Sequence, residues 1–67
     1  MKRYHTVVRR TFIKDGLLRE EYIRVEDDYY EEASYYEKYY SESWSYPDTE
    51  SAIVVNQFVT EDTEDDE

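Results

Sequence analysis

The sequence predicts a small α+β domain of order ββαβ, with a three-stranded antiparallel sheet and one covering helix. Three observations favour it: a hairpin signal at Asp15-Gly16, tyrosines at helical spacing in mid-chain, and a β-branched run near the end. The 67 residues fit one marginally stable domain, because so short a chain buries only roughly 60 % of its unfolded surface. We expect this domain to cover residues 1–60, followed by a disordered acidic tail over residues 61–67.

The sequence predicts the β-hairpin over residues 3–25. Apolar residues alternate with polar ones on both sides of Asp15-Gly16, a dipeptide typical of the type I′ turn, which requires positive φ at both positions. The two-residue loop predicts the cross-strand pairs Lys14–Leu17, Phe12–Arg19, Arg10–Glu21, Val8–Ile23 and Thr6–Val25. The predicted core face carries Tyr4, Val8, Phe12, Leu17, Ile23 and Val25.

The sequence predicts a helix over residues 28–43 and the third strand over residues 52–60. Asp28 is a favourable N-cap, with Glu31 at the spacing of a capping box. At 100° per residue, one set of aromatic and small side chains falls on a core stripe or close to it: Tyr29, Ala33, Tyr36, Tyr40 and Trp44. Tyrosine is a weak helix former, so an extended segment competes with this interpretation.

The charges are strongly segregated along the chain. Seven of eight basic residues precede Glu26, whereas fifteen of eighteen acidic residues lie at or after it. A helix over residues 26–42 would place its seven carboxylates roughly 3.6 Å apart along its axis, close to the charge spacing of one DNA strand. Tyr35 and Tyr39 fall among these acids, where they can contact arginines of a basic partner. The predicted partner-binding residues are Asp27, Asp28, Glu31, Glu32, Tyr35, Tyr39 and Glu42.

The sequence contains few of the residue patterns that catalysis or cofactor binding requires. His5 is the only histidine and is expected at a surface or rim, and Gly16 is the only glycine, which excludes phosphate-binding glycine loops. The chain has no cysteine, and its acidic tail lacks the calcium-loop pattern. We therefore expect no enzyme, no metal site and no cofactor. No apolar run approaches the length of a membrane span, and the N-terminus lacks a signal-peptide pattern, so a cytoplasmic protein is expected.

In its small size, lack of cysteine and acidic aromatic segment Glu26–Glu50, the chain resembles phage-encoded anti-defence proteins, including anti-CRISPR proteins and DNA mimics. The resemblance is one of composition over roughly half the chain. It implies a non-enzymatic inhibitor that blocks the DNA-binding site of a nuclease or effector complex in the host cell, without itself binding nucleic acid.

Other interpretations stay open. The acidic segment could bind a basic protein without competing with DNA. The basic hairpin could contact nucleic acid through Arg3, Arg9, Arg10 and Arg24. Arg9, Arg10 and Arg24 could instead contact an acidic patch, or the acidic face of a second copy in a homodimer. Tyrosines flanked by acids also suit sulfation, which requires a secretory route.

Overall fold

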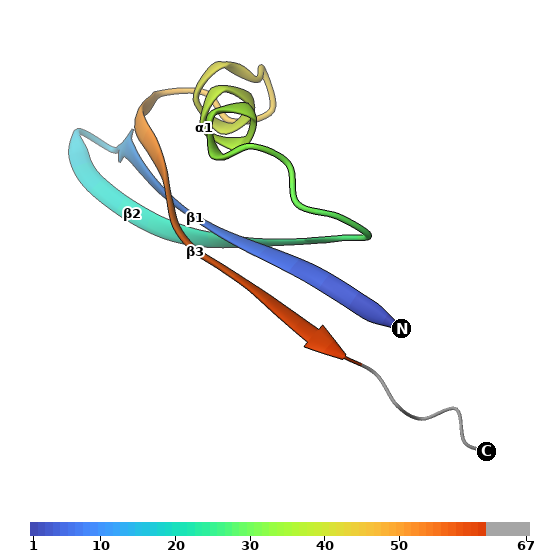
Figure 1. Ribbon diagram of the computed structural model, residues 1–67. Coiled ribbons are helices and arrows are strands. Elements are labelled where there is room, and N and C mark those ends of the chain that lie inside the picture. The colour runs from blue at the N-terminus through green and yellow to red at the C-terminus, as the bar shows by residue number, and fades with distance from the viewer. Residues whose placement is uncertain (62–67) are drawn as a thin grey trace.

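The computed structural model describes residues 1–61 and shows one antiparallel sheet with a helix on one side (Figure 1). The elements are β1 Lys2–Lys14, β2 Leu17–Asp27, α1 Ala33–Glu42 and β3 Thr49–Glu61. The strand order is β2-β1-β3, so the first strand is the central one. The predicted ββαβ order and the three-stranded sheet with one helix are confirmed.

The hairpin forms in the predicted register. Asp15 and Gly16 have φ of 55° and 77°, the positive values that a type I′ turn requires. Lys14 pairs with Leu17, and Val8 pairs with Ile23, as predicted. The strands extend a little further than residues 3–25, since β1 begins at Lys2 and β2 continues to Asp27.

The third strand, β3, is also longer than predicted and pairs with β1 with two irregularities. It runs from Thr49 to Glu61 instead of residues 52–60, so Glu61 belongs to the sheet and not to a tail. Register shifts between Val7 and Val8 and between Thr11 and Phe12 mark β-bulges, which bend a strand and strengthen its twist. The rest of the predicted tail, residues 62–67, lies outside the described residues.

The predicted helix over residues 28–43 is too long at its start. α1 begins at Ala33, and Glu32 occupies the N-cap position without a side-chain cap. Asp28 is therefore not the N-cap, because β2 continues pairing to Asp27 and the chain leaves the sheet there. Tyr30 packs edge-on against Tyr4 of β1, with ring centroids 4.9 Å apart, so a tertiary contact holds this segment extended.

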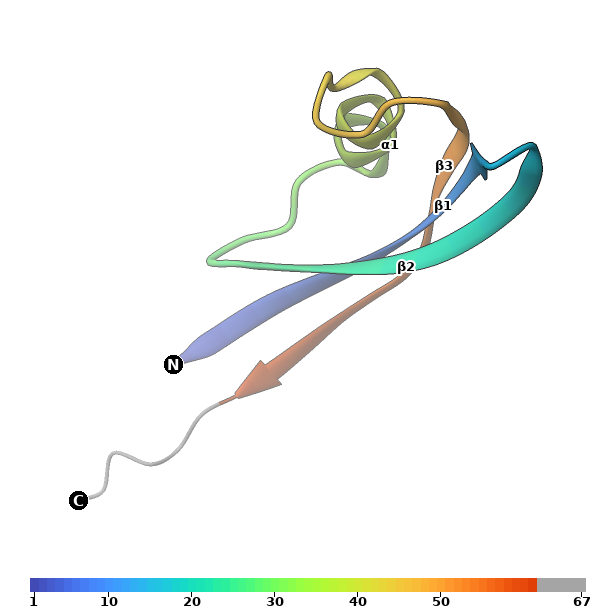
Figure 2. The same ribbon diagram turned by 180° about the vertical axis from the view of Figure 1, so that it is seen from behind.

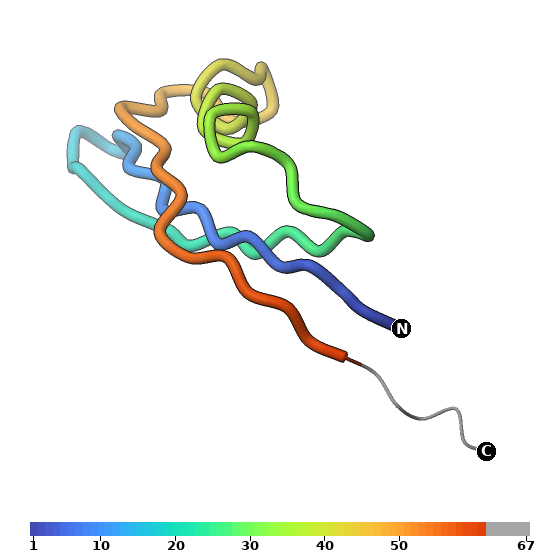
Figure 3. The backbone as a smooth tube through the Cα atoms, in the orientation of Figure 1, coloured from blue at the N-terminus to red at the C-terminus, as the bar shows by residue number. Residues whose placement is uncertain are grey.

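The core is small because the helix is much shorter than the sheet. Ten helical residues span about 15 Å, whereas the 13 residues of β1 span about 43 Å. The start of β1 and the end of β3 extend well past α1 (Figure 3). The buried apolar cluster consists of Val8, Tyr36, Tyr40 and Ala52, with Ile23, Val25, Tyr46 and Val54 packed against it.

Three members of the predicted core stripe, Tyr29, Ala33 and Trp44, lie outside this cluster. Tyr29 precedes α1 and Trp44 follows it, and both side chains are exposed. Ala33 is exposed at the first position of the helix, and Leu17 is exposed at the hairpin tip, beyond the reach of α1. Tyr36 and Tyr40 are buried as predicted. Among residues 1–61, no helix has the length and apolar character needed to cross a membrane.

Candidate functional site

Helix α1 presents two tyrosines to solvent and two to the core. Tyr35 and Tyr39 lie four residues apart, one turn along the outer surface, and are 54 % and 48 % exposed. Each packs edge-on against a buried neighbour, Tyr35 against Tyr36 with ring centroids 5.4 Å apart, and Tyr39 against Tyr40 at 4.9 Å. The buried rings therefore restrict the exposed ones, which lowers the entropy that the exposed rings would lose on binding.

Trp44 is the most exposed aromatic side chain in the described residues, at 91 %. It lies in the turn after α1, where the Ser43 hydroxyl accepts a bond from the Ser45 backbone N–H at 3.1 Å and the Ser43 carbonyl accepts one from the Tyr46 N–H at 3.0 Å. The predicted position of Trp44 close to the core stripe is wrong, because the helix ends two residues before it. The signal for a turn was the run Ser43-Trp44-Ser45 ahead of Pro47.

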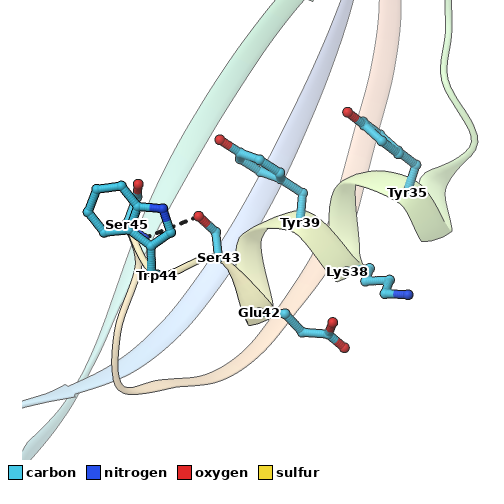
Figure 4. Close-up of a pocket in the computed structure, with 7 residues that line it drawn as sticks. All are labelled: Tyr35, Lys38, Tyr39, Glu42, Ser43, Trp44 and Ser45. Carbon is cyan, nitrogen blue, oxygen red and sulfur yellow. Dashed lines mark hydrogen bonds between the residues drawn. The ribbon is translucent and has the colours of Figure 1, made fainter.

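These aromatic side chains border an open depression of about 630 Å³ (Figure 4). In Figure 4 the Tyr35 and Tyr39 rings point in the same direction from the helix, while Lys38 and Glu42 extend from another side. The lining residues are Tyr35, Lys38, Tyr39, Glu42, Ser43, Trp44 and Ser45. We call this set the aromatic depression.

A second, smaller hollow of about 270 Å³ lies between α1 and β2. Val25 and Asp27 contribute from β2, and Tyr35, Tyr36, Tyr39 and Tyr40 contribute from α1. Tyr35 and Tyr39 line both hollows and thus form the ridge between them. A partner side chain on either side of the ridge would meet a tyrosine ring and a carboxylate, Asp27 on one side and Glu42 on the other.

The other predicted site acids, Asp28, Glu31 and Glu32, differ in their surroundings. Asp28 accepts a bond from Arg3 Nη1 at 2.8 Å, and Glu31 accepts one from the Tyr29 hydroxyl at 3.0 Å. Glu32 is exposed at the start of α1. The structure therefore brings Asp27, Tyr35, Tyr39 and Glu42 together around the ridge, while Asp28 and Glu31 have partners elsewhere.

The predicted row of seven carboxylates along one helix does not form. Only Glu37 and Glu42 lie within α1. Glu37 is also occupied, since its Oε2 accepts the Val54 backbone N–H of β3 at 3.0 Å, which ties the helix to the sheet. The match to the spacing of a phosphate strand is therefore wrong, although the acids of residues 28–50 still number seven against the single Lys38.

Arg10 is a structural residue and not a surface contact. It is 6 % exposed, and its guanidinium forms an ion pair with Glu21 at 2.6 Å, as the predicted cross-strand pair implied. It also donates to Thr49 Oγ1 at 2.7 Å and to the Pro47 carbonyl at 2.8 Å. The ring of Tyr46 lies 5.2 Å from its guanidinium carbon. One residue of the basic hairpin thus anchors the loop that follows Trp44.

His5 is buried, which contradicts the expected surface or rim position. Its ring stacks on Phe58 with centroids 4.6 Å apart and planes 8° from parallel. Arg24 Nη1 lies 2.8 Å from Nδ1, and Thr60 Oγ1 lies 2.8 Å from Nε2. Because arginine can only donate, Nδ1 is the acceptor and Nε2 carries the proton. The burial arises from β3 pairing, which places Phe58 opposite His5.

Hydrogen bonding and burial shift the pKa of a few groups. A hydrogen bond from Arg3 at 2.7 Å lowers the pKa of the Glu26 carboxyl, against a smaller opposing effect of desolvation. The bond to Glu31 raises the pKa of the Tyr29 hydroxyl, and burial raises that of Tyr40. These two tyrosines therefore remain neutral at physiological pH. Within residues 1–61 no group of three or more His, Asp or Glu side chains converges as a metal ligand set.

Comparison with protein-family models, with curated proteins and with solved structures finds no match for this chain. The case for a function therefore depends on the chemistry of the surface.

Proposed function

We propose that this protein is a non-enzymatic inhibitor that occupies the nucleic-acid-binding site of a basic protein, such as a nuclease or a CRISPR effector complex. One observation carries the proposal: exposed Tyr35, Tyr39 and Trp44 lie beside Glu42 on a segment whose acids far outnumber its bases. A nucleic-acid site offers the complementary chemistry, since arginines and lysines placed for phosphates accept carboxylates. Such a target would lie in the host cytoplasm, where we place the action of this protein.

The aromatic residues supply what carboxylates alone lack. Exposed ion pairs contribute little each and are screened by salt. Tyrosine and tryptophan, by contrast, are frequent binding hot spots and form cation–π contacts with arginine. Carboxylates would thus steer the partner toward the surface, and the ridge and Trp44 would hold it.

A second candidate is an acidic interaction module that binds a basic protein without excluding DNA. The observation that favours it is the failure of the carboxylate row, because Glu37 and Asp28 are engaged internally. The aromatic depression can also receive a single protruding side chain of a partner, whereas a DNA mimic needs charges in an extended line. The two candidates share a binding surface and differ in whether DNA competes.

A displacement experiment separates them. The immobilised chain is incubated with a bacterial extract, and the captured proteins are challenged with duplex DNA. Inhibition by mimicry predicts that DNA releases the captured protein, because this protein cannot bind the chain and DNA at the same time. Capture should also weaken as the salt concentration rises. A partner that binds both at once would refute mimicry and support the second candidate.

A matched pair of variants locates the surface. Glu32→Lys combined with Glu42→Lys should reduce affinity for the captured protein at least about tenfold, because both side chains are exposed. Glu61→Lys makes the same type of change at the far end of β3 and should have little effect. Equal affinity of all three proteins would remove the α1 surface from the interface.

A further inference from the structure

The face of the sheet turned away from α1 has no covering layer among the described residues (Figures 1 and 2). Strand pairing assigns side chains to it, because residues paired across strands share a face and successive residues alternate. We call it the open sheet face. Its apolar and aromatic members are Val7, Ile13, Leu18, Tyr22, Ile53 and Phe58, together with His5, whose ring is buried beside Phe58.

This face is unusually apolar for a solvent-exposed side of an antiparallel sheet, which is normally polar. Leu18 is 66 % exposed, Tyr22 is 63 % exposed and Ile53 is 42 % exposed. Tyr22 of β2 and Ile53 of β3 lie on either side of Arg9 in the central strand, and β1 contributes Val7 and Ile13 to the same face. The core on the other face of the sheet is small. Covering the open sheet face would therefore bury more apolar surface, which a chain this short needs for stability.

The charge of the open sheet face indicates which partner can cover this face. The whole chain carries a formal charge of −10, so two copies repel each other at most orientations. The open sheet face is an exception, since its ionic residues are three arginines against two glutamates: Arg3, Arg9, Arg24, Glu20 and Glu26. Two copies meeting here would place their acidic segments on the outside and a nearly neutral surface between them.

The pattern of charges is also self-complementary. Arg9 and Glu20 are diagonal neighbours on β1 and β2, about 7–8 Å apart by strand geometry. Neither forms an ion pair within residues 1–61. In a two-fold symmetric contact, Arg9 of each copy can meet Glu20 of the other, the reciprocal arrangement that such interfaces require.

The available area is sufficient for a specific contact. Three strands about 4.8 Å apart, paired over 11 residues, present a flat area of about 500 Å². Two such faces bury about 1,000 Å² together, at the lower limit of specific interfaces. From apolar exposure, charge and area, we propose that the open sheet face is the interface of a two-fold symmetric homodimer. This inference does not depend on the proposed function.

Sedimentation of the full chain at about 100 μM tests the proposal, a concentration at which a micromolar dimer is populated. We expect a dimer whose fraction rises with salt, because salt screens the repulsion between two copies of charge −10. Tyr22→Glu with Ile53→Glu should raise the dimer dissociation constant at least about tenfold. Tyr39→Glu with Trp44→Glu adds the same charge on the other side and should leave it within about twofold. A monomeric wild-type chain would overturn the proposal.

A charge exchange between copies tests the geometry. Arg9→Glu alone and Glu20→Arg alone should each weaken the dimer, because each places like charges together. An equimolar mixture of the two variants should restore it, since both reciprocal pairs are then complementary. A mixture that stays monomeric while the wild type dimerises would refute the Arg9–Glu20 contact, and a dimer sensitive only to Tyr39 and Trp44 would refute the interface. Circular dichroism of each variant confirms that the monomer is folded.

Discussion

The aromatic depression and the open sheet face are both exposed and rich in aromatic or aliphatic side chains, yet their charges differ. The depression lies within residues 28–50, which carry seven acids and one lysine, whereas the open sheet face carries three arginines and two glutamates. Apolar exposure alone shows that a surface can bind; the surrounding charge determines what it can bind. We therefore expect the first to bind a basic partner and the second to bind another copy of the chain. Salt should therefore act in opposite directions, weakening the first contact and strengthening the second.

Arg10 lies on the sheet face that α1 covers and holds the loop that follows the aromatic depression, so its replacement should show the largest effect. Arg10→Met keeps the bulk of the chain but removes the bonds to Glu21, Thr49 and the Pro47 carbonyl. We expect a loss of about 2–3 kcal/mol in the free energy of unfolding, measured by urea denaturation, because polar groups in a partly buried network lose their partner. The loop after Trp44 should also loosen, seen as increased hydrogen exchange at Tyr46. Unchanged stability would show that the hairpin does not hold this loop.

Trp44→Ala should have the next largest effect, on binding alone. Loss of a hot-spot aromatic lowers partner affinity by about 2 kcal/mol, or roughly 30-fold. Unfolding should change by less than about 0.5 kcal/mol, because the side chain is already 91 % exposed. Tyr22→Ala is the matched control on the open sheet face and should leave partner affinity unchanged. Calorimetry with the captured partner gives both affinities, and an equal loss in the two variants would contradict the division between the surfaces.

Glu26→Gln should have the smallest effect, on the pH dependence of stability. Arg3 joins Glu26 of the open sheet face to Asp28 of the acidic segment. The pKa of folded Glu26 lies below its ordinary value of 4.5, so its stabilisation is present above pH 4.5 and is lost as pH falls through the lowered pKa. The difference in melting temperature between wild type and Glu26→Gln should therefore shrink on acidification. A difference independent of pH would indicate that the charge of Glu26 does not contribute.

About half of the candidate site could be predicted from sequence. Helical periodicity correctly placed Tyr36 and Tyr40 in the core and Tyr35 and Tyr39 outside it, because the spacing of a helix determines which residues share a side. It failed at both helix ends. Periodicity does not show where a helix stops, and so Tyr29 and Trp44 were assigned to a stripe that α1 does not reach.

Local sequence information is sufficient for the hairpin, its register and the alternation of its two faces. Asp15-Gly16 sets the turn through backbone conformation, and a two-residue loop leaves one register, so this information is local. The burial of His5 and Arg10, by contrast, depends on long-range contacts, because it follows from β3 pairing on the far side of β1. The same long-range contacts leave one face of the sheet uncovered among residues 1–61, because α1 is short and packs on the opposite face, mainly against β3.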